Sequence, residues 1–295
     1  MIKVVKQDKK YPFSRGILAR ALTRAGLSIE GSYEIVEKIK KELKDKEQTE
    51  IKSEVLVKKV SEELLQRNRV VEEKYFRVRR QIKYLDSSVF IMIGGSSGVG
   101  KSTISSAIGH KLGINRVIGT DTIREIMRSM LSEDLIPALH KSSFYAGESL
   151  KTTYVTNKLI YGFLQQVGIV TEGIKSVMMR GVKEGLNMVI NGVHVVPGFI
   201  ENTAKNQNNI LFKYILDVPD VDSHIRNFYN REEESLRDPN RYISKIKSIR
   251  KIQEYLNKTA KKQEVEVIKN KNYNETIKFI LNDIIKRIDK LNEEV

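Results

Sequence analysis

Eight residues that follow an apolar run constrain this chain more than any other feature. Val89-Phe90-Ile91-Met92-Ile93 is a continuous apolar run, typical of a strand buried on both faces. Soon after it, Gly95-Ser96-Ser97-Gly98-Val99-Gly100-Lys101-Ser102 fits the pattern G-x-x-x-x-G-K-[ST] at every position. A helical pattern begins at Thr103, so the loop lies between a strand and a helix, the context that this motif requires.

The residue types of this loop suit the binding of phosphate groups. Glycines let the backbone curl so that successive N–H groups point inward, and the positive end of the following helix adds to the field. Lys101 supplies a charge for the β- and γ-phosphates, and the hydroxyl of Ser102 is a hard ligand for Mg²⁺. We therefore predict a P-loop that binds ATP and Mg²⁺. The predicted nucleotide-binding residues are Gly95, Ser96, Ser97, Gly98, Val99, Gly100, Lys101, Ser102 and Thr103.

Composition excludes several classes of protein. The chain has no cysteine, which rules out disulfides, thiolate catalysis and cysteine-based zinc or iron–sulfur sites. Its four histidines are scattered along the sequence. No run of 18 apolar residues exists, and the N-terminal residues lack the apolar core of a signal peptide, so we expect a soluble, cytoplasmic protein without a membrane partner.

The net charge is strongly positive. Lys and Arg number 52 against 37 Asp and Glu, which gives a formal charge of +15. This excess suits a nucleic acid or an anionic small molecule such as a nucleotide or a phosphorylated acid. Solvated helix faces rich in Lys and Glu are the alternative.

The pattern of apolar residues changes near residues 85–88. Before this point the spacing is mostly helical, with a short extended entry at 2–5. After it, buried strands alternate with helices, which indicates a parallel sheet. Strands are predicted at 89–93, 117–118, 188–190, 211–216 and 265–268. Helices are predicted at 103–112, 123–131, 152–167, 175–183, 222–234, 242–259 and 275–291.

The predicted fold class is thus α/β, a P-loop NTPase-type parallel sheet flanked by helices and preceded by a small, mostly helical domain. We place the two domains at residues 1–88 and 89–295.

Asp121 is the strongest candidate for a catalytic carboxylate. It follows the second predicted strand of the sheet, at the edge where ligands of open α/β folds bind. There it could accept the proton of a substrate hydroxyl or hold magnesium through water. The alternative is an N-cap of the helix that follows, and both roles are compatible.

Several basic residues are candidates for binding anionic groups. Arg124 and Arg128 are four apart, so they lie on one face of a helix and could bind substrate, unless they are plain surface residues. His194 follows a buried strand and is a further substrate-binding candidate, although a lone histidine is often structural. Arg226 and Arg231 lie in an Arg-rich segment that continues through Arg237, Arg241 and Arg250, where a lid would stabilise the transferred phosphoryl group. At least two of these arginines are expected to serve in the lid; ion pairs with Glu232–Glu234 are the alternative. Together with Lys101 and Asp121, Arg226 and Arg231 complete the predicted catalytic set.

Residues 89–295 resemble archaeal 2-phosphoglycerate kinase. The resemblance lies in the runs Gly95–Thr103, Gly119–Arg124, Asn191–Gly198 and Ser248–Leu256. It implies that the γ-phosphoryl group of ATP is transferred to the 3-hydroxyl of 2-phosphoglycerate, giving 2,3-bisphosphoglycerate for cyclic 2,3-diphosphoglycerate biosynthesis. One departure is Asn191, which stands where related kinases carry an acid.

Residues 1–88 resemble an ATP-cone domain, which implies a regulatory nucleotide. The matching features include Val5–Asp8, Phe13, Arg15, Gly26, Tyr75, Arg77 and Arg79. Gln7-Asp8-Lys9 replaces the usual Arg-Asp-Gly of that domain, and a mere oligomerisation module is the alternative.

Other functions share part of this evidence. A P-loop kinase of another acceptor, such as a nucleic-acid 5′-end, a nucleoside or a sugar nucleotide, would use the same loop, Asp121 and arginines. An ATP-responsive regulator that binds nucleic acid would use the positive charge, but a cysteine-free chain cannot form the zinc ribbon of such regulators, and no helix-turn-helix is evident. We therefore do not expect a nucleic-acid partner. No feature of the sequence indicates an oligomeric state.

Overall fold

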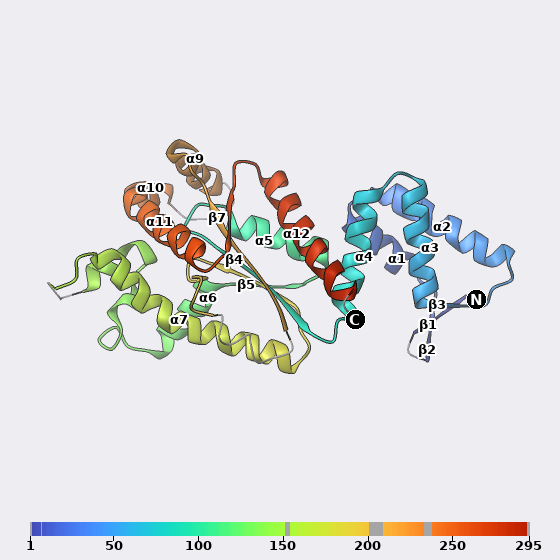
Figure 1. Ribbon diagram of the computed structural model, residues 1–295, viewed down its shortest axis with the longest axis horizontal. Helices are drawn as coiled ribbons and strands as arrows, with labels where there is room; N and C mark the ends of the chain where they lie inside the picture. The colour runs from blue at the N-terminus through green and yellow to red at the C-terminus, as the bar shows by residue number, and fades with distance from the viewer. Residues whose placement is uncertain (1, 7, 151–153, 201–208, 233–237, 294–295) are drawn as a thin grey trace. The chain divides into compact units, whose positions relative to one another are not determined.

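The computed structural model describes residues 2–293 except 7, 151–153, 201–208 and 233–237, and the chain divides into two compact units (Figure 1). The first unit contains the residues up to Leu85, together with His110–Gly113 and the residues from Asn282 onward. The second contains Asp86–Gly109 and Ile114–Leu281. The division thus falls three residues before the predicted boundary (88 − 85 = 3) and groups two short segments of the predicted kinase domain with the first unit.

The first unit combines four helices with a small sheet. The helices are α1 (Arg15–Ala25), α2 (Ile29–Asp45), α3 (Ser53–Gln66) and α4 (Val70–Tyr84). Ser14 caps α1 by accepting a hydrogen bond from the backbone N–H of Ile17, and Gly26 ends it at a φ of 119°. These helices confirm the mostly helical reading of this region.

The small sheet has the order β2-β1-β3 and was only partly predicted. β1 (Lys3–Lys6) pairs antiparallel with β2 (Lys9–Pro12) and parallel with β3 (Glu50–Lys52). β1 agrees with the expected extended entry. The other two strands were missed because β2 is exposed throughout and β3 has one buried residue, Ile51, so neither has an apolar pattern to reveal it.

The second unit is built on a five-stranded parallel sheet of order β5-β6-β4-β7-β8. Its strands are β4 (Ser88–Gly94), β5 (Arg116–Gly119), β6 (Met188–Gly192), β7 (Asn209–Asp217) and β8 (Glu266–Lys269). All five predicted strands are present. β4 lies at the centre and is fully buried, as its unbroken apolar run requires.

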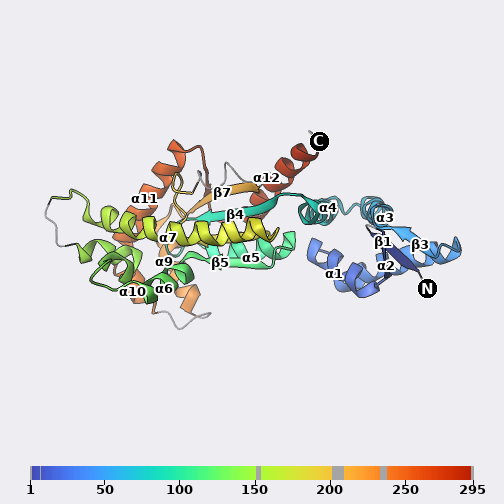
Figure 2. The same ribbon diagram turned by 90° about the horizontal axis from the view of Figure 1, so that it is seen from below.

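Helices flank this sheet on its two faces. They are α5 (Lys101–Leu112), α6 (Thr120–Met130), α7 (Lys158–Lys183), α9 (Val221–Glu232), α10 (Pro239–Ile243), α11 (Ile246–Lys262) and α12 (Tyr273–Glu293), with two short 3₁₀ helices, η1 (Pro137–His140) and η2 (Ser143–Ser149). Both views show α7 running along the strands on one face (Figure 1 and Figure 2). Among the described residues, no helix combines the length and apolar character needed to span a bilayer.

Two helix predictions differ from the structure. The helices predicted at 152–167 and 175–183 are one helix, α7, because the apolar stripe continues past Gly168 and Gly173 without a break. The helix predicted at 242–259 begins at Ile246, since a separate short helix, α10, starts after the N-cap Asp238 and ends at Ile243.

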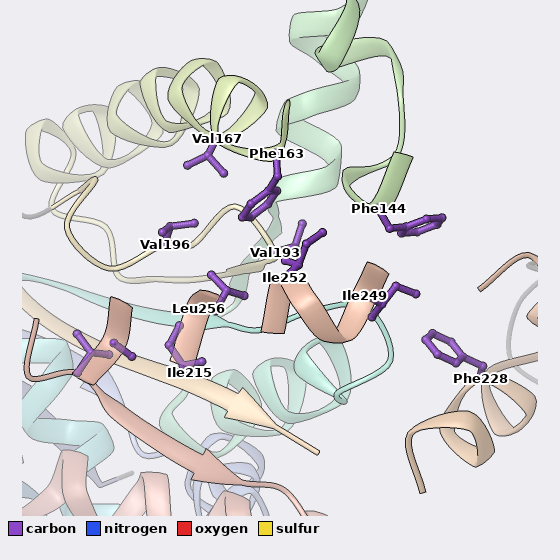
Figure 3. Close-up of a cluster of buried hydrophobic side chains, with 12 residues drawn as sticks. Phe144, Phe163, Val167, Val193, Val196, Ile215, Phe228, Ile249, Ile252 and Leu256 are labelled. Carbon is purple, nitrogen blue, oxygen red and sulfur yellow. The ribbon is translucent and has the colours of Figure 1, made fainter. Parts of the chain in front are cut away.

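A hydrophobic cluster joins α7, α11 and β7 and reaches the elements around the sheet edge (Figure 3). Phe163 of α7, Ile215 of β7 and Leu256 of α11 are fully buried in it. Phe144 of η2 and Phe228 of α9 extend the cluster toward the ends of the strands. The segments that surround the carboxyl edge of the sheet are therefore fixed by the same core as the sheet itself.

Gly162→Ala is predicted to destabilise the protein by about 2–3 kcal/mol, because the new Cβ would clash with the carbonyl oxygen of Ala146 in η2. Gly168→Ala in the same helix is the matched control, because a Cβ there meets nothing within 4 Å, and it is predicted to be neutral or to stabilise by roughly 0.5–1 kcal/mol. Urea unfolding of both variants measures the difference. Equal stabilities would contradict the packing of α7 against η2.

Candidate active site

At Gly98 and Gly100 the loop between β4 and α5 has a backbone that favours glycine. Gly98 and Gly100 have φ values of 85° and 88°. A Cβ on Gly98 would lie 2.6 Å from the ring of Phe228, and one on Gly100 would lie 2.8 Å from the hydroxyl of Tyr273. Side chains from α9 and α12 thus close on the loop from outside.

The start of the loop is held by side-chain hydrogen bonds. The backbone N–H of Ser96 donates to Oε1 of Gln253 at 2.7 Å, and Nε2 of Gln253 donates to the carbonyl of Leu216 at 3.0 Å. Gln253 of α11 therefore links the loop to the end of β7. Nζ of Lys101 donates to the carbonyl of Ser96 at 2.6 Å, which places the ammonium group inside the curve of the loop.

A cleft of about 1110 Å³ opens at the loop and extends over the carboxyl ends of β5 and β6. Six residues of the loop and of the start of α5 line it: Ser97, Gly98, Gly100, Lys101, Ser102 and Thr103. Of the other predicted nucleotide-binding residues, Ser96 and Val99 have buried side chains, and Gly95 has no side chain to offer. They can reach a ligand only through their backbone. The volume is large enough for a nucleotide and a second small molecule.

Asp121 lines the same cleft as Ser102. It is the second residue of α6, which follows β5 directly, and it is exposed. The N-cap position of α6 is Gly119, so the alternative reading of Asp121 as the N-cap is wrong. Its place in the first turn still suits an acidic side chain, because the helix dipole is positive there.

Arg124 and Arg128 also line the cleft, on one face of α6 as their spacing predicts. Arg124 is held in place: its Nη1 donates to the carbonyls of Leu139 at 3.3 Å and Lys141 at 2.7 Å. Both arginines form ion pairs with Glu125, at 2.7 and 2.8 Å. Arg128 has 42% of its side chain exposed against 13% for Arg124, so Arg128 is the more available to a ligand.

His194 is not part of the cleft surface, and its predicted substrate contact has no support from the geometry. The side chain is fully buried, with Nδ1 2.9 Å from Oγ1 of Thr120 and Nε2 2.9 Å from Oε1 of Gln166. Because an amide oxygen only accepts, Nε2 carries the proton and Nδ1 accepts from the hydroxyl of Thr120. Burial lowers the pKa of His194 to about 4, so the ring is neutral at pH 7.

The role of His194 is to join two parts of the cleft wall. Thr120 immediately precedes Asp121, and Nε2 of Gln166 donates to the carbonyls of Ala138 and Lys141 at 2.9 Å each. The imidazole therefore bridges the turn that carries Asp121 and the segment that anchors Arg124.

Of the two predicted lid arginines, Arg226 does not line the cleft. Arg226 is exposed, donates to Oγ of Ser223 at 2.6 Å and lies 3.8 Å from Asp220. The side chain of Arg231 lies outside the described residues.

Arg241, which lies in the Arg-rich segment predicted to form a lid, lines the cleft. Its Nη2 donates to Oγ of Ser142 at 2.6 Å, and its guanidinium lies 6.0 Å from the ring centre of Phe144. Asp238-Pro239 is a helix-start signal that could have located α10 and with it this arginine. Asn227, Asn230, Tyr242 and Tyr273 also line the cleft, and no sequence signal singles them out.

Among the described residues, no group of three or more His, Asp or Glu side chains could hold a metal ion by itself. The oxygen donors near the loop are the hydroxyl of Ser102 and the carboxylate of Asp121, and Asn191 at the end of β6 adds an amide. One or two protein oxygens are what Mg²⁺ uses when phosphates and water supply the rest. The donor set therefore fits a magnesium ion bound together with a nucleotide.

The central strand of a parallel sheet leads through a glycine loop to a helix that begins with a lysine, and a carboxylate follows another strand at the same edge of the sheet. This combination defines the P-loop class of nucleotide-binding proteins. Comparison with known proteins identifies the family within this class to which the chain belongs.

The 2-phosphoglycerate kinase of Thermococcus kodakarensis is 38% identical over 99% of this chain and 99% of its own length. That of Pyrococcus horikoshii is 37% identical over 97% of this chain and 95% of its own, and that of Methanopyrus kandleri is 37% identical over 100% and 90%. The chain belongs to the 2-phosphoglycerate kinase family, as its sequence predicted.

The model of the ATP cone domain matches residues 2–84, which confirms the prediction for the N-terminal region. Among solved structures, a gluconokinase from Sinorhizobium meliloti is 13% identical with a TM-score of 0.40, covering 71% of this chain and 98% of that one. A shikimate kinase from Acinetobacter baumannii is 13% identical with a TM-score of 0.41, covering 70% and 98%. The family assignment rests on the archaeal relatives alone.

Stability is predicted to fall as pH falls from about 6.5 to 4, because unfolded His194 binds a proton in that range and the buried ring does not. Between pH 7 and pH 5 this group should cost about 2 kcal/mol of unfolding free energy. His194→Gln should lose that part of the pH dependence, whereas His140→Gln should keep it. Urea unfolding at the two pH values is the measurement, and an unchanged slope in His194→Gln would refute the buried neutral state.

Proposed function

We propose that this chain transfers the γ-phosphoryl group of ATP to the 3-hydroxyl of 2-phosphoglycerate, giving ADP and 2,3-bisphosphoglycerate for cyclic 2,3-diphosphoglycerate biosynthesis. The name of the archaeal relatives supports the substrate. The observation that carries the proposal is that one cleft is lined by the glycine loop, Asp121 and a set of arginines. A kinase needs this combination: a binding site for the triphosphate, a carboxylate that accepts the proton of the acceptor hydroxyl, and cationic side chains that bind an anionic acceptor.

The phosphate end of the cleft stabilises the transferring group. Backbone N–H groups of the loop and Nζ of Lys101 bind the β- and γ-phosphates. They also stabilise the negative charge that develops on the bridging oxygen. Mg²⁺, held by Ser102 and in part by Asp121, would neutralise phosphate charge. Lys101 acts as a catalytic residue because it contacts the transferring phosphoryl group.

Asp121 handles the acceptor. Its carboxylate accepts the proton of the 3-hydroxyl as the acceptor oxygen forms a bond to the γ-phosphorus, while the bond from phosphorus to the bridging oxygen breaks and ADP leaves. The bridge through His194 supports this role, since it fixes the turn on which Asp121 stands.

The opposite wall binds the acidic groups of the acceptor. 2-Phosphoglycerate carries a carboxylate and a phosphate, and Arg128 and Arg241 line the cleft from two different elements. Arg124 lies beside them and is anchored to the backbone, so it contributes positive charge at a fixed point. Guanidinium groups suit both anions, because they donate two parallel hydrogen bonds.

An acceptor panel tests the proposal. Mg-ATP is supplied with 2-phosphoglycerate, 3-phosphoglycerate, glycerate, a nucleoside or an oligonucleotide 5′-end, and ADP release is followed. The fastest turnover is predicted for 2-phosphoglycerate. Asp121→Asn should lower kcat about 10²- to 10⁴-fold and change the Kd for ATP only slightly.

The control for this variant is Asp134→Asn, an exposed acid that does not line the cleft. It should retain full activity. If Asp121→Asn also keeps its kcat, then Asp121 does not handle the acceptor. If a nucleoside or an oligonucleotide is preferred in the panel, the assigned substrate is wrong.

Arg241→Gln is predicted to raise KM for 2-phosphoglycerate roughly tenfold or more, because it removes charge-assisted hydrogen bonds to an anion. KM for ATP should change little. Arg180→Gln, which removes an exposed arginine paired with Glu184 on α7, is the control and should leave both constants unchanged. Steady-state kinetics with each substrate varied measures both constants. An unaltered KM for 2-phosphoglycerate would show that Arg241 does not bind the acceptor.

For the N-terminal region we propose a second, regulatory nucleotide site, supported by the ATP cone match over residues 2–84. Lys101→Ala weakens the loop in the cleft and leaves the first unit intact. Isothermal titration of the full chain with ATP should therefore give two bound nucleotides per wild-type chain and one tight site in Lys101→Ala. A single site in the wild type, lost in Lys101→Ala, would favour the oligomerisation alternative.

A further inference from the structure

Helix α9 makes two hydrogen bonds to the outer side of the glycine loop. Nε2 of His224 lies 2.7 Å from the carbonyl oxygen of Ser97, and Nδ2 of Asn227 donates to the carbonyl of Gly98 at 2.9 Å. The two side chains lie nearly one turn apart, so they bind two consecutive carbonyls from one helix face.

The next carbonyl is bound from a different element. Nδ2 of Asn270, just after β8, donates to the carbonyl of Val99 at 3.0 Å. The hydroxyl of Thr276 donates to Oδ1 of Asn270 at 2.9 Å, which fixes the amide with its nitrogen toward the loop. Asn270 and Thr276 are both buried, so this donor cannot turn away into solvent.

Three consecutive carbonyls of the loop, at Ser97, Gly98 and Val99, thus each receive a side-chain donor from outside. In a trans peptide the C=O and the following N–H point in opposite directions. Holding these carbonyls outward therefore directs the N–H groups of Gly98, Val99 and Gly100 to the inner side of the loop, where the cleft lies. A hydrogen bond on a carbonyl also polarises its peptide and makes the N–H a stronger donor.

We propose that His224, Asn227 and Asn270 are positioning residues for the triphosphate: they hold three successive peptide planes so that their N–H groups bind phosphate. This rests on the proposed use of a nucleoside triphosphate at this loop. His224 and Asn270 contact the loop and do not line the cleft, so they act on phosphate affinity without touching the ligand; Asn227 lines the cleft and acts through its bond to the carbonyl of Gly98.

The state of His224 agrees with this role. A carbonyl only accepts, so Nε2 must carry the proton. Burial lowers the pKa of His224, and its Nδ1 is buried without a hydrogen-bond partner among the described residues, so the neutral ring with the proton on Nε2 is favoured. The ring stacks on Phe228, with centroids 5.3 Å apart and an angle of 17°, which holds it against the loop.

The test compares phosphate affinity with acceptor affinity in three variants, His224→Phe, Asn227→Leu and Asn270→Leu. Each keeps the approximate volume of the side chain and removes the donor. The probes are ATP, measured by calorimetric titration, and inorganic tripolyphosphate, measured as an inhibitor competitive with ATP. Each variant should bind both probes about 3- to 10-fold more weakly, with KM for 2-phosphoglycerate unchanged.

Two controls distinguish a role in positioning the loop from a merely structural role. His224→Gln places an amide nitrogen near the position of Nε2 and should recover most of the lost affinity. Asn274→Leu changes an exposed asparagine four residues from Asn270 and should leave the Kd values as in the wild type.

Three outcomes would overturn the proposal. In the first, folded variants bind tripolyphosphate as the wild type does. In the second, the variants lose only thermal stability and active fraction, with unchanged Kd for ATP. If the wild type itself binds neither ATP nor tripolyphosphate, the proposed function fails as well, which distinguishes that failure from the first two.

Discussion

The direction of a few peptide planes governs the rest of this structure. A loop that offers backbone N–H groups to an anion must turn its carbonyls the other way, and buried carbonyls need donors of their own. Side chains from α9 and from the residue after β8 supply those donors here, and Gln253 of α11 holds the start of the loop. The elements that follow the central strand are therefore required by the geometry of the loop as well as by the hydrophobic core.

The two ends of the cleft are built by different means. The phosphate end consists mainly of backbone, so its chemistry depends on fixed dipoles and one ammonium group. The acceptor end consists of charged side chains on α6 and α10, whose positions depend on polar contacts such as those of Arg124 with η1 and Arg241 with Ser142. Buried His194 connects two parts of the acceptor end, because it bonds both Thr120, which precedes Asp121, and the glutamine that holds the segment behind Arg124.

Features with local signals could be predicted from the sequence, and features that depend on distant partners could not. The strand at 89–93 and the glycine loop were correct because an unbroken apolar run and a fixed spacing identify them. His194 was predicted to bind substrate because it is polar and follows a buried strand. Its hydrogen-bond partners, Thr120 and Gln166, lie 74 and 28 residues away, so no local signal reveals its buried position. Arg226 and Arg241 both follow β7 in the Arg-rich segment, on α9 and α10, and of these two Arg241 lines the cleft. The sequence pattern does not distinguish them, because their places relative to the cleft depend on tertiary packing.

The central claim is that the curled loop after β4 holds the triphosphate of ATP through its backbone. A crystal structure of the protein with magnesium and adenylyl imidodiphosphate tests it most directly. The account predicts phosphate oxygens within hydrogen-bond distance of the N–H groups of Gly98, Val99 and Gly100, with the ammonium of Lys101 beside the terminal phosphate. Nucleotide bound elsewhere on the chain, or a loop whose carbonyls face the phosphates, would contradict it.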